Sequence, residues 1–295
     1  MTLKLGLLTR NQNSWCSARI RKAMIDHGIE PICFSFSDLI ARVGFKPYVS
    51  IRNHEDFISE IKGVIVRPIG RGSLDEIIFR LDLLHKLERS GVVIINPPLA
   101  IERAVNKYHS LTILEEHGIP IPKTIVSENP DKMLEAFNEI GGDVVLKPIF
   151  GSRGMGVCRV SDFEIARRIF NALHYNRNVL YAQEFLPHGN RDIRAFVVDG
   201  EVIAAMYRRS DSWKTNISQG AQPIPYKPSK DVEDLAIKST QVLGCIVAGV
   251  DILETKDGYF VNEINSQPGF RGLQSVTKVD IASKIVECLI KRMKK

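Results

Sequence analysis

Hydrophobic positions follow two different periods in the first third of the chain. Four short apolar runs are typical of buried strands, and they span residues 3–9, 30–36, 63–69 and 92–98. Between these runs, residues 17–28 and 74–91 carry apolar side chains at helical spacing, and each segment ends in a glycine, a common helix stop. Strands that alternate with helices favour a parallel sheet, so the pattern predicts a small α/β domain over residues 1–97.

The remaining chain divides into two further parts. Residues 100–118 read as one helix, and the pattern up to about residue 180 continues with strands, two more helices and a glycine-rich turn. From residue 181 onward strands dominate, with one helix at 229–244 and a last helix at 280–295. We therefore expect three domains, which cover residues 1–97, 98–180 and 181–295.

Composition narrows the class of protein. The 295 residues are 44% hydrophobic and 25% charged, which is ordinary for a globular protein with several cores. No apolar run is long enough to span a membrane, and the first ten residues do not resemble a secretory signal, so we expect a cytoplasmic protein. The five cysteines are scattered and lack a C-x-x-C pair, which argues against disulfides and structural zinc.

The basic balance of the chain raises the question of nucleic acid. The net charge is +6 and the pI is about 9.0, yet only the final KRMKK is a dense basic block. No nucleic-acid-binding module is recognisable. A basic cleft for anionic small molecules explains the charge equally well, and we do not expect nucleic acid to be the main partner.

The segment YFVNEINSQPGF, residues 259–270, suggests a metal site. Side chains alternate faces along a strand, so Glu263 and Asn265 point the same way. Asp251 lies on a preceding strand-like run, and pairing of the two strands would bring three oxygen ligands together. Such ligands suit magnesium held with a nucleotide, whereas zinc would need histidine or cysteine. The alternative is a solvated strand edge before the Pro268–Gly269 turn.

A glycine-rich turn follows Lys147 in the segment LKPIFGSRGMGV. Its glycines, Gly151, Gly154 and Gly156, let backbone N–H groups approach a phosphate and adopt positive φ, and Ser152 adds a hydroxyl. The segment lacks the G-K-[ST] ending of a Walker loop, and a strand rather than a helix follows it. The pattern predicts a hairpin-like flap over phosphates, and the alternative is a plain tight hairpin.

Two further segments carry candidate nucleotide contacts. In QEFLPHGNRDIRAF, the backbone of Glu184 to Leu186 is placed to meet an adenine edge. Asp192 and Arg194 share one strand face, where a cross-strand salt bridge is the alternative to a role at the nucleotide. Lys107 is a second candidate for a phosphate, although a lysine on a helix is usually only solvated.

The motifs, taken in order, resemble those of a known family. The segments LKP, GSRGMGV, QEFL, DIRAFVV, AAMYRRS, TNISQGA, AGVDIL and VNEINSQPGF resemble an ATP-grasp carboxylate–amine ligase of the RimK type. The resemblance covers the whole chain and is strongest from about residue 98 to the end. It implies an α/β (α+β) ATP-grasp fold of three domains, the first of them a Rossmann-like pre-ATP-grasp domain, with the nucleotide between the other two.

The resemblance also implies roles for particular residues. It places the nucleotide against Lys107, Lys147, Gly151, Ser152, Gly154, Met155, Gly156, Gln183, Glu184, Phe185, Leu186, Asp192, Lys214 and Asn216. Lys214 stands where other members often have arginine, so it keeps the charge and loses the bidentate fork. Asp251, Glu263 and Asn265 match metal ligands for magnesium or manganese, which we expect as two ions. Lys147 and Arg208 match residues that offset charge on the transferred phosphoryl group.

The implied reaction joins L-glutamate to a carboxylate through an acylphosphate, with ATP as phosphoryl donor. RNQNSW and EINSQPGFRGL look closest to an archaeal group that acts on an acidic cofactor, and tetrahydromethanopterin is the first choice of acceptor. The deazaflavin coenzyme, a ribosomal protein C-terminus, an amino-group carrier protein and a catalytically inactive nucleotide-binding protein stay open as alternatives. We expect Arg194, Arg209 and Arg271 to contact the substrate, and the enzyme to be a homo-oligomer without membrane partners.

Overall fold

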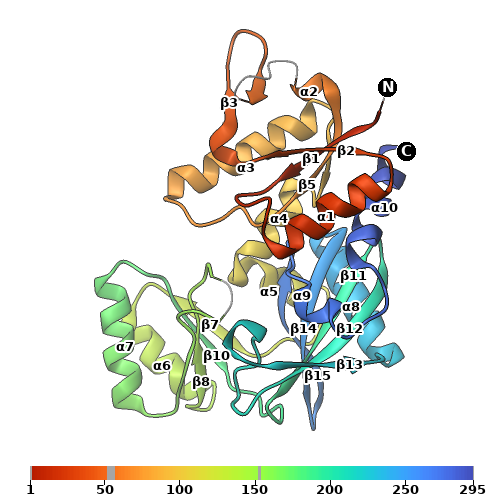
Figure 1. Cartoon of the computed structure of the whole chain (residues 1–295). Coiled ribbons are helices and arrows are strands. Elements are labelled where there is room, and N and C mark those ends of the chain that lie inside the picture. Colours follow the sequence, from red (N-terminus) through yellow and green to blue (C-terminus); the bar gives the residue numbers. More distant parts are fainter. Residues whose placement is uncertain (1, 52–56, 152–153, 295) are drawn as a thin grey trace.

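The computed structural model describes residues 2–51, 57–151 and 154–294, and it contains three principal sheets (Figure 1). The first sheet has the order β2-β1-β5-β6, and all of its pairings are parallel. Its strands are β1 (Lys4–Leu8), β2 (Glu30–Phe34), β5 (Ile61–Val66) and β6 (Val93–Ile95). The parallel α/β arrangement expected for the first part of the chain is confirmed.

Helices and a small hairpin complete this first part. The helices are α1 (Trp15–Asp26), the short α2 (Phe57–Glu60) and α3 (Leu74–Arg89). A 3₁₀ turn, η1 (Phe36–Asp38), leads into the antiparallel pair β3 (Leu39–Ala41) and β4 (Val49–Ile51), which the sequence pattern did not predict. In Figure 1 this hairpin projects beyond the parallel sheet, at the end of the molecule farthest from the other two sheets.

The helix expected over residues 100–118 is wrong as a single element, because the chain breaks it at Asn106. The structure has α4 (Pro98–Val105) and α5 (Lys107–Glu116) instead. The Asn106 side chain accepts a hydrogen bond from the backbone N–H of His109 at 3.1 Å, so it caps a new helix. The break makes Lys107 the first residue of α5. From this position its side chain reaches Gly151 and Glu263.

The second sheet is antiparallel and has the order β7-β10-β8-β9. Its strands are β7 (Thr124–Ser127), β8 (Val144–Leu146), β9 (Cys158–Val160) and β10 (Leu180–Glu184). Helices α6 (Pro130–Glu139) and α7 (Phe163–Tyr175) cover one face, where Phe137 and Phe170 are fully buried. Strand β10 belongs to this sheet, so the expected boundary between residues 180 and 181 cuts through the start of β10. A boundary after Glu184 would keep the second sheet whole.

The third sheet is also antiparallel, with the order β13-β12-β11-β14-β15. Its strands are β11 (Arg191–Val198), β12 (Glu201–Arg209), β13 (Gln222–Tyr226), β14 (Val247–Thr255) and β15 (Gly258–Asn265). A 3₁₀ turn, η2 (Ile217–Gln219), precedes β13, and α8 (Lys230–Leu243) packs on the sheet. Two helices end the chain, α9 (Arg271–Gln274) and α10 (Ile281–Met293).

The last helix returns to the first sheet. Figure 1 shows α10 beside α1, and α10 also packs against β5 and β6. A single apolar core therefore joins the two ends of the chain, since Leu5 and Met24 share it with Phe196, Phe270 and Leu289. No helix in the described part of the chain is long and apolar enough to cross a membrane.

Asn96 adds a polar link at the end of β6. Its Oδ1 accepts hydrogen bonds from the backbone N–H groups of Ile246 and Val247, both at 2.8 Å. Its Nδ2 donates to the carbonyls of Val247 and Ser266. The side chain is 1% exposed, so these bonds tie the first sheet firmly to β14 and to the chain that follows β15.

Candidate active site

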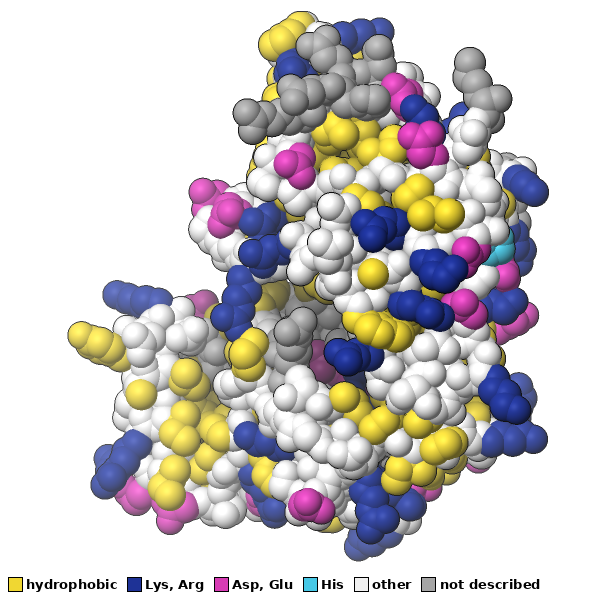
Figure 2. All heavy atoms as spheres, in the orientation of Figure 1, with side chains coloured by type: hydrophobic (Ala, Val, Ile, Leu, Met, Phe, Trp, Pro, Cys, Tyr) yellow, Lys and Arg dark blue, Asp and Glu magenta, His cyan; other side chains and the backbone are white. Residues whose placement is uncertain are grey.

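A pocket lies between the second and third sheets, and it gathers most of the residues that the sequence singled out. From the expected set, its lining comprises Lys107, Lys147, Gly151, Gly154, Met155, Gln183, Glu184, Phe185, Leu186, Asp192, Arg208, Lys214, Asn216, Asp251 and Glu263. Ser152, also expected here, lies outside the described residues. Figure 2 shows the molecule hollowed at the centre of one face, between the first sheet and the other two, with Lys and Arg side chains around the hollow.

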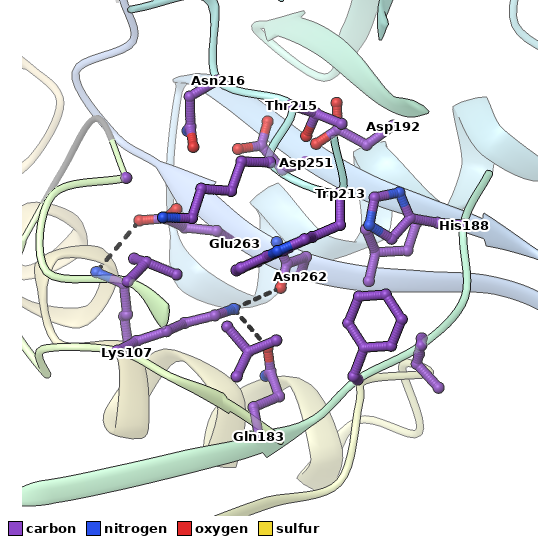
Figure 3. A pocket seen from close by; sticks show the side chains of 18 of the residues that line it. Lys107, Gln183, His188, Asp192, Trp213, Thr215, Asn216, Asp251, Asn262 and Glu263 are labelled. Atoms are coloured by element: carbon purple, nitrogen blue, oxygen red, sulfur yellow. Dashed lines mark hydrogen bonds and ion pairs between the residues drawn. The ribbon is translucent and has the colours of Figure 1, made fainter. Parts of the chain in front are cut away.

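Lys147 is half-buried in this pocket, directly after β8. Its Nζ donates to Oε1 of Gln183 at 2.5 Å and to Oδ1 of Asn262 at 2.8 Å (Figure 3). Burial lowers the pKa of the Lys147 ammonium to about 8, although the carboxylate of Glu263 opposes that shift. The two amides that hold this ammonium are neutral and do not compensate its charge, so an anion bound here would stabilise it.

Lys107 approaches the pocket from α5. Its Nζ donates to the carbonyl of Gly151 at 2.9 Å and lies 3.4 Å from Oε1 of Glu263. The lysine therefore contacts both the glycine-rich turn and strand β15. Lys107 is not merely solvated, because its side chain is only 12% exposed.

A β-bulge shapes the floor of the site. Asp251 on β14 faces Glu263 on β15, but the register then shifts so that Ile252 faces Val261. Asn262 is the extra residue, and strict alternation would have turned it away from Glu263. Both Asn262 and Glu263 line the pocket as a result, and sequence reasoning missed Asn262 for this reason.

Buried ion pairs cross the third sheet beside Asp251. Arg208 on β12 holds Asp192 on β11 through Nε–H to Oδ1 at 2.8 Å and a second, shorter contact, and its Nη2 lies 3.1 Å from Oδ2 of Asp251. Arg194 on β11 donates to Oδ2 of Asp251 at 2.9 Å. Burial alone would lower the pKa of Arg208, but the carboxylates of Asp192 and Asp251 outweigh it and raise that pKa.

These pairs decide a question that the sequence left open. Asp192 and Arg194 do share a face, and each forms a cross-strand salt bridge with its neighbour on the adjacent strand. Asp192 and Arg208 also line the pocket. For Asp192 the two alternatives are therefore compatible, since it forms the salt bridge and lies at the site. Arg194 is not among the residues that line it.

Aromatic side chains form the other end of the pocket. The rings of Phe185 and Trp213 meet edge to face with centroids 6.1 Å apart, and the ring of His188 lies 6.0 Å from Phe185. The guanidinium of Arg159 lies 3.5 Å from the centre of the Phe185 ring. Trp213 and His188 were not expected from the sequence, and Trp213 could have been noticed between the motifs AAMYRRS and TNISQGA.

The glycine-rich turn lies over the pocket between β8 and β9. Gly154 has φ +69° and Gly156 has φ +72°, as expected for a turn that needs glycine. A Cβ on Gly154 would collide with the side chains of Asn216 and Gln219. The turn therefore packs closely against the η2 segment of the third sheet, and Met155 Sδ lies 3.4 Å from Nη2 of Arg71 in the first part of the chain.

Four other expected residues lie away from the pocket lining. Gly156 shapes the turn without lining the pocket. Asn265 lies two residues after Glu263 on β15, and its Nδ2 is buried and has no partner among the described residues. Arg209 points to the opposite side of β12 from Arg208 and lines a separate hollow with Arg191 and Glu254, because side chains alternate along a strand. Arg271 begins α9 and is exposed.

The donor set fits a hard cation. Asp251 and Glu263 offer carboxylates from adjacent strands, and Asn265 lies on the same side as Glu263 with an amide oxygen to offer. No cluster of three His, Cys, Asp or Glu side chains occurs within residues 2–51, 57–151 and 154–294, so an ion here would need amide and phosphate oxygens as well. Glu263 meets Lys107 and Asp251 meets two arginines, so cations already balance both carboxylates.

Comparison with known proteins places this geometry among ligases. The model of the RimK-like ATP-grasp domain matches residues 104–289. The chain is 36% identical over 290 residues to the tetrahydromethanopterin:alpha-L-glutamate ligase of Methanococcus maripaludis, with 97% of each chain covered. It is 36% identical to the ligase of that name from Methanocaldococcus jannaschii, with 99% of this chain and all of that one covered.

Solved structures show the same fold at lower sequence identity. A RimK domain protein ATP-grasp from Sphaerobacter thermophilus superimposes with a TM-score of 0.78 at 20% identity, over 97% of this chain and 99% of that one. The ATP-grasp ligase PsnB, complexed with a minimal precursor, Mg and ADP, gives a TM-score of 0.74 at 20% identity, over 100% and 99% of the two chains.

Proposed function

The chain belongs to the RimK-like ATP-grasp family of ADP-forming ligases, and we propose that it adds L-glutamate to an acidic acceptor of the tetrahydromethanopterin type. One observation carries the choice of acceptor. The identity of 36% to two methanogen ligases of that name extends over nearly the whole of both chains, including the first part that lies outside the family model. The pocket supports the ligase chemistry.

The half-buried Lys107 and Lys147 bind the phosphates of ATP in this proposal. Lys147 is already held in place by Gln183 and Asn262, so its ammonium loses little side-chain freedom when it meets a phosphate oxygen. Lys107 sits between Gly151 and Glu263, where it can follow the turn as it moves. The adenine lies at the Phe185 and Trp213 end, where the backbone of Glu184 to Leu186 meets its polar edge.

Arg208 faces the transferred phosphoryl group. Its charge is fixed because Asp192 and Asp251 raise its pKa, and the two carboxylates also orient the guanidinium. The acceptor carboxylate attacks the γ-phosphorus and ADP leaves, and the glutamate amine then attacks the acyl carbon and phosphate leaves. The turn over the pocket keeps water from the acylphosphate, since Gly154 lies against Asn216 and Gln219.

The family uses ATP together with Mg²⁺. We propose that Asp251, Glu263 and Asn265 hold magnesium or manganese, as two ions beside the nucleotide. Such ions would offset the negative charge of the phosphates and so favour attack at phosphorus. With Glu263 engaged by an ion, Lys107 would be free to contact phosphate.

A second class of acceptor has support of its own. The chain is 31% identical to the probable alpha-L-glutamate ligase of Vibrio atlanticus over 99% of its length, and a further PsnB structure is complexed with a precursor peptide. A protein or peptide terminus is therefore the alternative acceptor, together with the deazaflavin coenzyme. We also propose that the enzyme works in the cytoplasm, where ATP and glutamate are supplied, and that it forms a homo-oligomer.

Turnover with a panel of acceptors tests the proposal. Purified enzyme is incubated with ATP, Mg²⁺ and labelled L-glutamate, together with the pterin, the deazaflavin coenzyme or a ribosomal protein C-terminal peptide. We expect ADP release and a mass gain of one glutamyl unit on the pterin. A gain only on the peptide would move the enzyme to the alternative class and leave the ligase chemistry in place.

A further inference from the structure

Three loops meet beside the glycine-rich turn, since Nη2 of Arg71 on one of them lies 3.4 Å from Sδ of Met155. They follow β1, β5 and β15, and they span residues 9–14, 67–73 and 266–271. Together they carry four arginines, Arg10, Arg67, Arg71 and Arg271, and no aspartate or glutamate. None of these arginines forms an ion pair with a carboxylate in the part of the chain that the structure describes. The convergence therefore concentrates positive charge without internal neutralisation.

Contacts between the loops show that they form one surface. Nη1 of Arg67 donates to the carbonyl of Pro268 at 3.1 Å, and its guanidinium carbon lies 6.0 Å from the centre of the Phe270 ring. The backbone N–H of Ile69 donates to Oε1 of Gln267 at 3.3 Å. The side chain of Arg10 runs so close to Gly70 that a Cβ there would collide with it.

Arg67 is the unusual member of this group. Its side chain is only 8% exposed, and burial lowers the pKa of its guanidinium. An arginine has five N–H donors, and the only hydrogen bond from this side chain to a described residue uses Nη1. A buried cation without a carboxylate partner is costly unless an anion joins it during function.

Gln267 supplies a second donor that lacks an acceptor. Its Nε2 is buried and has no partner among the described residues, while its Oε1 is fixed by the N–H of Ile69. The amide therefore cannot be turned to satisfy both atoms. Nε2 of Gln267 and the guanidinium of Arg67 are both donors on the loops that meet at Pro268.

The position of these donors fits a substrate subsite. In the order β2-β1-β5-β6 the chain turns from β1 toward one edge of the sheet and from β5 toward the other edge. The loops after β1 and β5 therefore flank a topological switch point, where open α/β sheets bind ligands. Gln267 follows Glu263 by four residues, which is roughly 13 Å of extended chain. A ligand of about that length would reach from these donors toward Glu263 with its other end.

We propose that Arg67 and Gln267, on loops that also carry Arg10, Arg71 and Arg271, form a subsite for a carboxylate of the acceptor other than the one that reacts. This inference rests on the proposed function and deepens it, because it selects acceptors that carry at least two anionic groups. The guanidinium accepts the carboxylate through paired N–H groups, and Nε2 of Gln267 donates to the same group. The incoming glutamate also carries carboxylates, so the experiment must separate the two sources.

Steady-state kinetics of Arg67→Gln and Arg67→Lys provide the first arm. We expect KM for the acceptor to rise about ten- to a hundredfold in Arg67→Gln, with KM for ATP and glutamate within twofold of wild type. Arg67→Lys should recover part of the loss, because it keeps the charge and lacks the fork. Arg42→Gln is the matched control, since Arg42 also donates to a backbone carbonyl, that of Pro47, within the remote β3–β4 hairpin. A rise for glutamate alone, or an equal rise for all three substrates, overturns the assignment.

Calorimetry without ATP provides an arm that does not depend on turnover. The probe is the dipeptide α-L-glutamyl-L-glutamate, and L-glutaminyl-L-glutamine is its neutral counterpart. We expect wild type and Arg42→Gln to bind the acidic dipeptide only, and Arg67→Gln to bind it at least tenfold more weakly. Equal affinity in wild type and Arg67→Gln, or no binding in wild type, rejects the subsite even if ligase activity is found. Binding as expected supports the subsite even if the pterin is not the acceptor.

Discussion

Nζ of Lys107 lies 3.4 Å from Oε1 of Glu263, so a lysine from the start of α5 neutralises a carboxylate at the end of β15. The same ammonium holds the carbonyl of Gly151, at the start of the glycine-rich turn. In our proposal Glu263 would hold the metal and Lys107 would contact the phosphates, so the two side chains would no longer pair when nucleotide is bound. Binding of nucleotide and movement of the turn are thereby coupled through one side chain.

Glu263→Gln tests this exchange. The amide keeps the shape of the side chain and removes its charge, so we expect kcat/KM for ATP to fall about a hundredfold or more, that is by about 3 kcal/mol. The metal concentration for half-maximal activity should rise as well. Glu254→Gln is the control, because Glu254 pairs with Arg191 and Tyr207 at the separate hollow. An unchanged metal requirement in Glu263→Gln would remove this residue from the metal site.

Asn262→Ala and Asn265→Ala should have different effects. Asn262 holds Lys147 through a hydrogen bond of 2.8 Å, so its loss should raise KM for ATP about fivefold, near 1 kcal/mol, and leave the metal requirement unchanged. Asn265 is proposed as a metal ligand, so its loss should raise the metal requirement. Activity titrated against Mg²⁺ and against ATP distinguishes the two. If Asn265→Ala matched wild type at limiting metal, the site would consist of the two carboxylates alone.

Nucleotide affinity should depend on pH through Lys147. The pKa of its ammonium is lowered to about 8 by burial, so the group is charged at pH 7 and largely neutral at pH 9. Phosphates bind the charged form, and we therefore expect affinity for ADP, measured by calorimetry, to weaken as pH rises through about 8. Lys147→Met should bind ADP weakly and lack this step.

The lowered pKa also predicts how the stability of the unliganded protein changes with pH. Stability should rise with pH, whereas affinity for ADP should fall. The folded pKa lies below the unfolded value of 10.5, so between about pH 8 and 10.5 the unfolded state binds more protons. The contribution of Lys147 to the free energy of unfolding should rise with pH across that window. Urea denaturation of wild type and Lys147→Met at pH 7.5 and 9.5 measures the difference. A larger rise in Lys147→Met than in wild type would contradict the lowered pKa.

Gly154→Val should damage turnover more than folding. A side chain at φ +69° is strained by about 1–2 kcal/mol, and it would also push the turn away from Asn216 and Gln219. Gly28→Val is the matched control, because Gly28 has φ +72° with nothing near its Cβ, at the end of α1. We expect similar losses of Tm in both variants and a loss of kcat only in Gly154→Val. Equal kcat in the two variants would leave the turn without a role as a lid.

Arg208→Met tests the buried ion pairs. Its removal leaves Asp192 and Asp251 with less charge compensation inside the sheet, so we expect the free energy of unfolding to fall by about 3–5 kcal/mol. Arg191→Met, which removes an exposed pair with Glu254, should cost about 0–1 kcal/mol. Urea denaturation gives both values. A small loss in Arg208→Met would show that the pairs contribute little to folding.

Periodicity predicted the main elements because most of them bury one side. The parallel strands of the first sheet, the helices α6 to α8 and the pair β14 and β15 all follow from apolar spacing. Strand β13 did not, since it carries Pro223 and Pro225 and lies at the edge of its sheet, where a missing N–H is tolerated. The break at Asn106 was missed because a capping side chain interrupts an otherwise continuous helical pattern.

The site was predictable where motifs carried it and hidden where geometry did. Lys147, Asp251 and Glu263 lie together as expected from their segments. Asn262 could not be foreseen, because the bulge inserts one extra residue into β15 and the alternation of apolar side chains does not show where such an insertion occurs. The isolation of Arg67 was equally invisible, since its burial depends on Pro268 and Phe270 from the far end of the chain.

Asn96 and α10 determine how the enzyme can be recombined with its relatives. Asn96 at the end of the first sheet bonds to Val247 and Ser266, and the apolar side chains of that sheet pack against Leu289. All three of these partners come from the last 50 residues. A chimera that exchanges residues 1–97 alone would therefore cut through a shared core. Under our proposal, transplanting acceptor specificity requires the N-terminal sheet to be moved together with all of its partners, which are Val247 on β14 and the segment from Ser266 through α10. The central sheet, residues 124–184, is not an independent piece either, since Lys147 bonds to Asn262 and Gly154 packs against Asn216.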